Sequence, residues 1–279
     1  MTVSETSHQA IFGNAIAALQ DPQPQRVWSV IVSLFGDLAQ GEGDQISGVA
    51  LTEICGLMGI RAEALRVALH RLRKDGWIDS LRDGRSSQHT LTAQGRRDTI
   101  SATPRIYAQP PHKPGTWRLV SADCDTALKG ITYPPGGFIA LSRRTALISG
   151  DGSDLADNVM IFRATPEHIP LWMQDKVCPT DLQASTRQFH QDLLKAQKLI
   201  ENTTGSDPVY ISALRTQIVH RWRRVVLRTP DLPNEFFPSG WMGDACRKQV
   251  TDLLALLPRP DLNALEVSAL QYRNLDQTD

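Results

Sequence analysis

The chain has 279 residues, and at ~150 residues per domain this length favours about two domains. Hydrophobic residues make up 41% and charged residues 22%, a composition that excludes a wholly disordered chain. Lys and Arg together number 30, as do Asp and Glu, so the formal charge is zero. This balance excludes a uniformly basic nucleic-acid coat, although a locally basic module remains compatible with it.

Export and membrane insertion are not expected. No run of ~18 apolar residues is present, and Met1 to Gln20 lacks the basic start and apolar stretch of a secretion signal. The four cysteines are far apart, with no C-x-x-C pair: Cys55, Cys124, Cys178 and Cys246. We therefore expect reduced, partly buried thiols rather than two disulfides, and a cytoplasmic protein.

After an N-terminal arm (1–24), residues 25–102 carry the pattern of a DNA-binding module. Apolar residues recur at helical spacing from Val27 to Leu38, and Ser47 offers an N-cap to a second helix. A third helix is expected from Arg61 to Asp75, ended by Gly76. Two extended runs, 77–82 and 86–91, then meet at Asp83-Gly84, a strong hairpin signal, and Thr92 caps a last helix to about Ser101. This order predicts a winged helix-turn-helix.

The remaining chain divides by composition. Residues 103–115 hold four prolines and predict a semi-rigid linker without a helix. Residues 116–177 mix strand-like runs (117–121, 137–141, 145–149 and 158–163) with helical patterns (123–129 and 166–174), which suggests a ferredoxin-like α+β domain. Residues 178–274 predict a helical domain with helices at 181–200, 206–227 and 244–257, and 275–279 form a polar tail. The predicted fold class is therefore α+β.

The neutral total conceals a basic segment. Between Arg61 and Arg97, nine basic residues face four acidic ones, a local surplus of five that leaves the rest of the chain at about minus five. A basic module on an acidic body is what a DNA-binding protein needs, because phosphates attract the module and repel the rest.

The predicted third helix should lie in the major groove. Leu65, Ala68, Leu69 and Leu72 form its buried stripe. The opposite side and its flanks present the candidate contacts Arg61, Glu63, Arg66, Val67, His70, Arg71 and Lys74. Glu63 could accept a hydrogen bond from cytosine, and Arg66 could bind guanine. The hairpin residues Arg82, Arg85, Ser86 and Ser87 suit phosphate or minor-groove contact.

Alternatives stay open for this module. A basic helix can be a solvated face, and the hairpin could bind RNA or protein instead. His70 is equally compatible with a base contact and with a plain exposed imidazole.

A second basic cluster lies on one predicted helix and consists of Arg221, Trp222, Arg223 and Arg224, with Arg215, His220 and Arg228 nearby. It could bind an anionic effector, with arginines on phosphates and Trp222 beside an aromatic group. The favoured alternative is structural, with arginines paired to acidic neighbours and Trp222 in the core. No nucleotide-binding, hydrolase or metal-binding motif occurs, so we expect no enzyme, no cofactor and no metal.

The chain resembles the PaaX-type repressors of phenylacetic acid catabolism from about Arg26 to Leu257. The resemblance rests on the segments 47–51, 64–72, 74–77 and 117–120. Its most specific part is carboxy-terminal, where residues 220–224 lead into 228–233, Phe237-Pro238 and 240–243.

The resemblance implies a homodimeric repressor on a palindromic operator of a phenylacetate-degradation operon. It also implies release from DNA by an acyl-coenzyme A effector, phenylacetyl-coenzyme A. The alternative is a constitutive or architectural winged-helix DNA-binding protein without ligand control.

Overall fold

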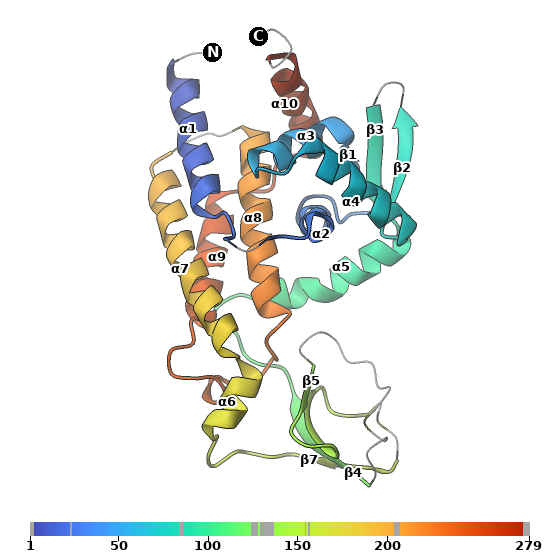
Figure 1. Ribbon diagram of the computed structural model, residues 1–279, viewed down its shortest axis with the longest axis vertical. Helices are drawn as coiled ribbons and strands as arrows, with labels where there is room; N and C mark the ends of the chain where they lie inside the picture. Colours follow the sequence, from blue (N-terminus) through green and yellow to red (C-terminus); the bar gives the residue numbers. More distant parts are fainter. Residues whose placement is uncertain are drawn as a thin grey trace. The chain divides into compact units, whose positions relative to one another are not determined.

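The computed structural model describes residues 3–22, 24–83, 86–123, 128, 137–153, 155, 157–203 and 207–275 (Figure 1). Within these ranges the chain forms ten α-helices, one 3-10 turn and two small antiparallel sheets, which confirms the α+β class. The chain divides into two compact units. The first contains residues 1–108, 189–223 and 246–279, and the second contains residues 109–188 and 224–245.

In the first unit, a three-stranded sheet and three helices follow one another along the chain. They are α2 (Val27–Leu38), β1 (Ile46–Ser47), α3 (Gly48–Leu57), α4 (Ala62–Lys74), β2 (Ile78–Asp83) and β3 (Ser86–Leu91). The predicted N-cap of α3 is confirmed, because the Ser47 side chain accepts a hydrogen bond from the Ala50 N–H at 3.0 Å. The strands lie in the order β1-β3-β2, and Ile78 faces Leu91 in the predicted hairpin. The hairpin's turn residues, 84 and 85, lie outside the described part.

Helix α5 (Ala93–Ile106) begins at the predicted cap, Thr92, but does not end where the sequence suggested. The prediction of irregular chain from Thr103 is wrong, since the helix continues for four more residues with Pro104 inside it. Its last turn is anchored, because the Ile106 side chain is buried and its carbonyl accepts a hydrogen bond from Trp222 Nε1 at 2.9 Å. Tertiary contacts here outweigh the local cost of proline.

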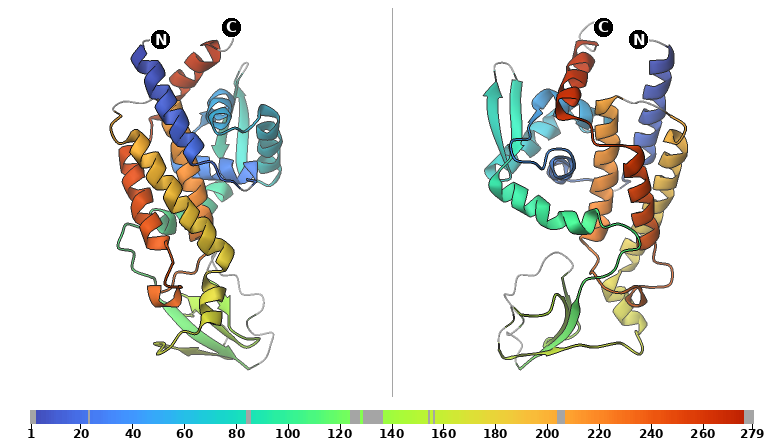
Figure 2. Two further views of the ribbon diagram at one scale, coloured as in Figure 1. Left: turned by 60° about the vertical axis from the view of Figure 1, so that its left-hand side comes forward. Right: turned by 180° about the vertical axis from the view of Figure 1, so that it is seen from behind.

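Five further helices are α1 (Val3–Ala18), α7 (Thr180–Ile200), α8 (Pro208–Val226), α9 (Gly243–Leu256) and α10 (Leu262–Leu275). Helices α7, α8 and α9 match predicted helices to within two residues, whereas α1 and α10 were not expected. Figures 1 and 2 show α2 lying between α8 and α4, and α10 packs against α3.

The second unit holds a four-stranded sheet formed by β4 (Trp117–Ala122), β5 (Phe138–Ala140), β6 (Thr145–Ser149) and β7 (Val159–Phe162). These strands match the four predicted ones, and their order in the sheet is β5-β6-β4-β7. The helix expected at 123–129 falls largely outside the described residues. The helix expected at 166–174 begins later, as α6 (Leu171–Val177), because Pro170 takes its N-cap position.

Two apolar clusters stabilise the second unit. Val120, Ala146 and Ile148 are buried together on the sheet. A second cluster joins α6 to the turn η1 (Asn234–Phe236), where the rings of Trp117 and Phe236 make an edge-to-face contact with centroids 5.2 Å apart.

Candidate nucleic-acid interface

Helix α4 separates its residues by burial as its sequence pattern predicts. Leu65, Ala68, Leu69 and Leu72 are all buried, at most 8% exposed, so the predicted core stripe is confirmed. Each buried leucine contributes roughly 1.5–3 kcal/mol from removal of apolar surface, which fixes the rotation of the helix about its axis. The other faces of α4 are consequently held toward solvent.

The outward face of α4 carries Glu63, Val67, His70 and Lys74, all of them exposed. Val67 is 70% exposed although a solvent-facing helix position favours a polar residue. A methyl-bearing side chain in this place suits contact with the methyl group of thymine. Glu63 and Arg66 form a loose ion pair of 3.8 Å, and both side chains remain about three-quarters exposed.

The two flanks of α4 differ in their partners. On the flank facing α2, Arg71 binds Asp75 at 3.3 Å and lies over the ring of Trp28, 5.2 Å from its centroid. On the flank facing the hairpin lie Arg66 and Arg73, both exposed. Arg61, also exposed, is the N-cap residue of α4 and makes no side-chain capping bond.

The hairpin residues were predicted to contact phosphates or the minor groove. Arg82 is exposed at the end of β2, and Ser86 begins β3 opposite Asp83. The hydroxyl of Ser87 is within hydrogen-bond distance of His89 Nε2, at 3.0 Å. Arg85 lies outside the described residues.

A buried histidine at the base of the hairpin was not anticipated from the sequence. The hydroxyl of Ser80 lies 2.7 Å from Nδ1 of His89, so both ring nitrogens have hydroxyl partners. Burial lowers the pKa of His89, and the positive charge of Arg73 lowers it further. The neutral imidazole therefore braces β2 and β3 against each other.

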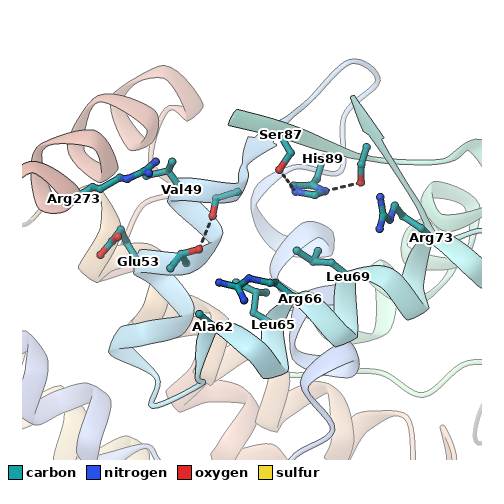
Figure 3. Close-up of a pocket in the computed structure, with 13 residues that line it drawn as sticks. Val49, Glu53, Ala62, Leu65, Arg66, Leu69, Arg73, Ser87, His89 and Arg273 are labelled. Carbon is teal, nitrogen blue, oxygen red and sulfur yellow. Dashed lines mark hydrogen bonds between the residues drawn. The ribbon is translucent and has the colours of Figure 1, made fainter. Parts of the chain in front are cut away.

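A groove of about 600 Å³ runs between α3, α4 and the hairpin (Figure 3). Its lining includes Gly48, Val49, Thr52 and Glu53 from α3, Ala62, Leu65, Arg66, Leu69 and Arg73 from α4, Ser80, Ser87 and His89 from the hairpin, and Arg273 from α10. Figure 3 shows Arg273 extending from α10 toward Val49. Arg273 was not among the predicted site residues, because α10 was not predicted and its contact with α3 is nonlocal.

The second basic cluster is largely internal. Arg221 binds Asp192 at 2.9 Å, donates to the Leu19 carbonyl at 3.0 Å and lies over the Phe189 ring. Trp222 is only 2% exposed and hydrogen-bonds the Ile106 carbonyl. This geometry corresponds to the structural alternative for these two residues.

The other two members of the cluster are half-buried. Arg223 donates to the hydroxyls of Ser29 and Ser33 at 3.3 and 3.4 Å, and burial lowers its pKa. Arg224 belongs to the second unit, and its side chain is not without a partner.

No group of three or more His, Cys, Asp or Glu side chains among the described residues could hold a metal ion. Cys55, Cys178 and Cys246 are free and buried, as expected, and burial raises each thiol pKa to about 12. Cys124 lies outside the described part. No described helix is both long enough and apolar enough to cross a membrane.

A family model described as PaaX-like protein matches residues 26–95, and one described as PaaX-like protein C-terminal domain matches residues 180–260. The chain belongs to the PaaX-like family. The second match of this PaaX-like chain ends before α10, and the first begins after α1.

Individual relatives agree with that assignment. The PaaX-like chain is 29% identical over 247 residues to the transcriptional repressor PaaX of Escherichia coli (strain K12), covering 79% of this chain and 77% of the relative. That relative is a regulator, and the family is not one of enzymes. A solved structure of an uncharacterized protein from Mycobacterium tuberculosis is 22% identical, covers 85% of this chain and 97% of that chain, and has a TM-score of 0.45.

Proposed function

We propose that this chain is a transcriptional repressor that binds duplex DNA through a winged helix-turn-helix formed by the elements from α2 to β3. The order of these elements and the strand order β1-β3-β2 support this assignment. The repressor role is supported by the name of the Escherichia coli relative. The observation that carries the proposal is the burial pattern of α4. Its core stripe is buried, while its charged and apolar contact residues face solvent beside the hairpin, where Arg82 is also exposed.

In this proposal α4 enters the major groove. Glu63 reads cytosine, Arg66 reads guanine and Val67 meets a thymine methyl group, with His70 and Lys74 along the same helix. Arg61 and Arg71 contact phosphates at the two ends of α4. Arg82, Arg85, Ser86 and Ser87 of the hairpin bind phosphates or the minor groove. The local surplus of five positive charges supports all of these roles, because it concentrates attraction to phosphate on one module.

Ligand control is proposed from the family resemblance. The effector is an acyl-coenzyme A, phenylacetyl-coenzyme A, and it releases a homodimer from a palindromic operator of a phenylacetate-degradation operon. Release requires that the thioester bind more tightly to the dimer geometry that cannot span two half-sites. Because Arg221 and Trp222 are buried against internal partners, the proposal for the effector does not depend on those two residues.

The second unit is proposed to relay this change as a ferredoxin-like domain. Its strand order, β5-β6-β4-β7, supports that assignment, because it places the first and third strands side by side at the centre. The C-terminal helices are proposed to dimerise.

The test is a binding titration with DNA from upstream of the chain's own gene. We expect higher affinity for this duplex than for a scrambled one at near-physiological ionic strength. Phenylacetyl-coenzyme A should then release the protein, whereas free coenzyme A, the matched control, should not. Absence of any preference for the upstream duplex would contradict the repressor proposal. If the protein prefers the upstream duplex but saturating phenylacetyl-coenzyme A does not change its affinity, the alternative holds, a constitutive winged-helix DNA-binding protein.

A further inference from the structure

The groove between α3, α4 and the hairpin is cationic. Three arginines line it, Arg66, Arg73 and Arg273, against one carboxylate, that of Glu53. All three arginines are exposed. A concave surface with this excess of guanidinium groups suits an anion with several oxygen acceptors, such as a phosphodiester.

The position of the groove relates it to the proposed DNA interface. The major groove is ~12 Å wide and an α-helix with its side chains is ~10–12 Å across, so the flanks of an inserted helix lie against the two phosphate backbones. Arg66 and Arg73 are seven residues apart, two helical turns, and therefore share the flank of α4 that borders the groove. When the outward face of α4 enters the major groove, one DNA phosphate backbone therefore runs along the flank that carries Arg66 and Arg73.

Helix α10 is fixed at the edge of this groove by contacts along its length. Glu266 Oε1 accepts a hydrogen bond from the Ser47 N–H at 2.8 Å, which ties α10 to the start of α3. The Ser268 hydroxyl donates to Asp207 at 2.7 Å, and the Tyr272 hydroxyl accepts from Gln9 at 2.8 Å. Arg273 directly follows Tyr272, so its side chain is presented from an anchored turn rather than from a loose tail.

We propose that Arg273 binds a phosphate of the DNA backbone, so that the C-terminal helix α10 forms part of the DNA interface. The inference rests on the proposed function and extends it to a helix outside both matched family segments. It also gives the interface a direct link to α1 and α8, because Tyr272 contacts Gln9 and the ring of Tyr210.

The experiment measures DNA affinity of the full chain as a function of salt for Arg273→Ala. Affinity should fall on the order of tenfold for specific and scrambled duplexes alike, as for a lost charge-assisted hydrogen bond. The slope of log affinity against log salt should become shallower by ~0.9, the value for one phosphate. Arg273→Lys should keep most of the slope. Lys248→Ala is the matched control, because Lys248 is exposed in the same unit but does not line the groove.

The outcomes separate this inference from the proposed function. If Arg66→Ala weakens binding while Arg273→Ala matches the unmodified chain in affinity and slope, the inference is wrong and the repressor proposal stands. An equal change of slope in Lys248→Ala would point to net charge and would also overturn the contact. If the unmodified chain itself shows no preference for its upstream duplex, both proposals fail. A second arm measures binding of coenzyme A alone. If Arg273→Ala binds coenzyme A more weakly but binds DNA normally, the groove is a site for a free nucleotide and the inference is overturned.

Discussion

Asp37, on α2, is a carboxylate with no solvent exposure that gathers three partners from distant parts of the first unit. Arg215 of α8 binds both of its oxygens at 2.8 Å, and Tyr107 donates its hydroxyl at 2.7 Å. Arg259 lies at 3.3 Å and is half-exposed. Burial raises the pKa of Tyr107, and the neighbouring charge of Asp37 raises it further, so the phenol stays a donor. The cluster holds α2, α5 and α8 in one arrangement.

Asp37→Asn should be strongly destabilising. The substitution leaves the guanidinium of Arg215, only 5% exposed, without its counter-charge, and breaking such a buried pair costs ~3–5 kcal/mol. Urea unfolding of the full chain measures the loss. The control is Asp252→Asn on α9, whose pair with Lys248 is exposed and should contribute ~0–1 kcal/mol. Similar small losses in both variants would show that the Asp37 cluster is not a main source of stability.

The contribution of His89 to the free energy of unfolding should decrease as pH falls. Because burial and Arg73 lower its folded-state pKa below the ordinary 6.5, the unfolded chain takes up the proton first as pH falls. Its stability contribution is therefore complete above pH ~6.5 and is lost as pH decreases through the folded-state pKa. The difference in unfolding free energy between the unmodified chain and His89→Gln should shrink between pH 8 and pH 5. A constant difference over that range would contradict the assignment of a buried neutral imidazole.

At the scale of the elements, the sequence patterns predicted best where the stabilising contacts are local. The stripe of α4, the Ser47 cap of α3 and the hairpin follow from helical periodicity, capping chemistry and a D-G turn, each spanning a few residues. Strand β1 has two residues and exists only through its pairing with His89 and Gln88, so no periodicity could indicate it.

The two unexpected helices carried weaker signals. In α1, Phe12, Ala15 and Ile16 are buried at helical spacing, with Leu19 just beyond its end, but the stripe contains small residues and follows a polar start. In α10, Asp261 caps the helix by accepting from the Ala264 N–H at 3.0 Å, a signal placed directly after a proline-containing segment. Both could be found by capping and spacing rules. The groove residue Arg273 could not, because its neighbours on α3 lie more than 200 residues away in sequence.

The packing of α5 against the hairpin root depends on a glycine. A Cβ at Gly95 would overlap the carbonyl oxygen of Trp77, which also accepts the Thr92 N–H at 3.0 Å. Gly95→Ala should destabilise the protein by ~1–3 kcal/mol although alanine is the better helix former. The added Cβ forces the backbone at Trp77, just before β2, to shift. Gly56→Ala in α3 is the matched control. Its Cβ meets nothing within 4 Å, so the change should stabilise by ~0.5–1 kcal/mol. Thermal unfolding of both variants checks the opposite signs; stabilisation by both would contradict the close approach.

At the scale of the whole molecule, the first unit is assembled from separated segments. Residues 25–102 and the C-terminal helices were assigned to different domains from sequence, and the structure gathers 1–108, 189–223 and 246–279 in one unit. The bonds that join them are nonlocal: Arg215 to Asp37, Trp222 to the Ile106 carbonyl, and His220 to Ser33 at 3.0 Å. Composition and periodicity indicate whether a segment is helical, extended or irregular, but they do not indicate which distant segments pair in the tertiary fold.

A fragment of residues 1–108 keeps the proposed winged helix-turn-helix but removes every element from β4 to α10. In this fragment Asp37 loses both arginine partners, and the Ile106 carbonyl loses the indole donor. The fragment loses these bonds, and removal of the helices that cover this surface also returns apolar groups to water at ~25 cal/mol per Å². Because domains are stable by only ~5–15 kcal/mol, the fragment should unfold at a clearly lower temperature than the full chain, and lower also than full-length Asp37→Asn. Circular dichroism melts of the three proteins make the comparison. A fragment that melts cooperatively at the temperature of the full chain would show that the proposed winged helix-turn-helix folds alone. The buried bonds to α8 would then contribute little to its stability.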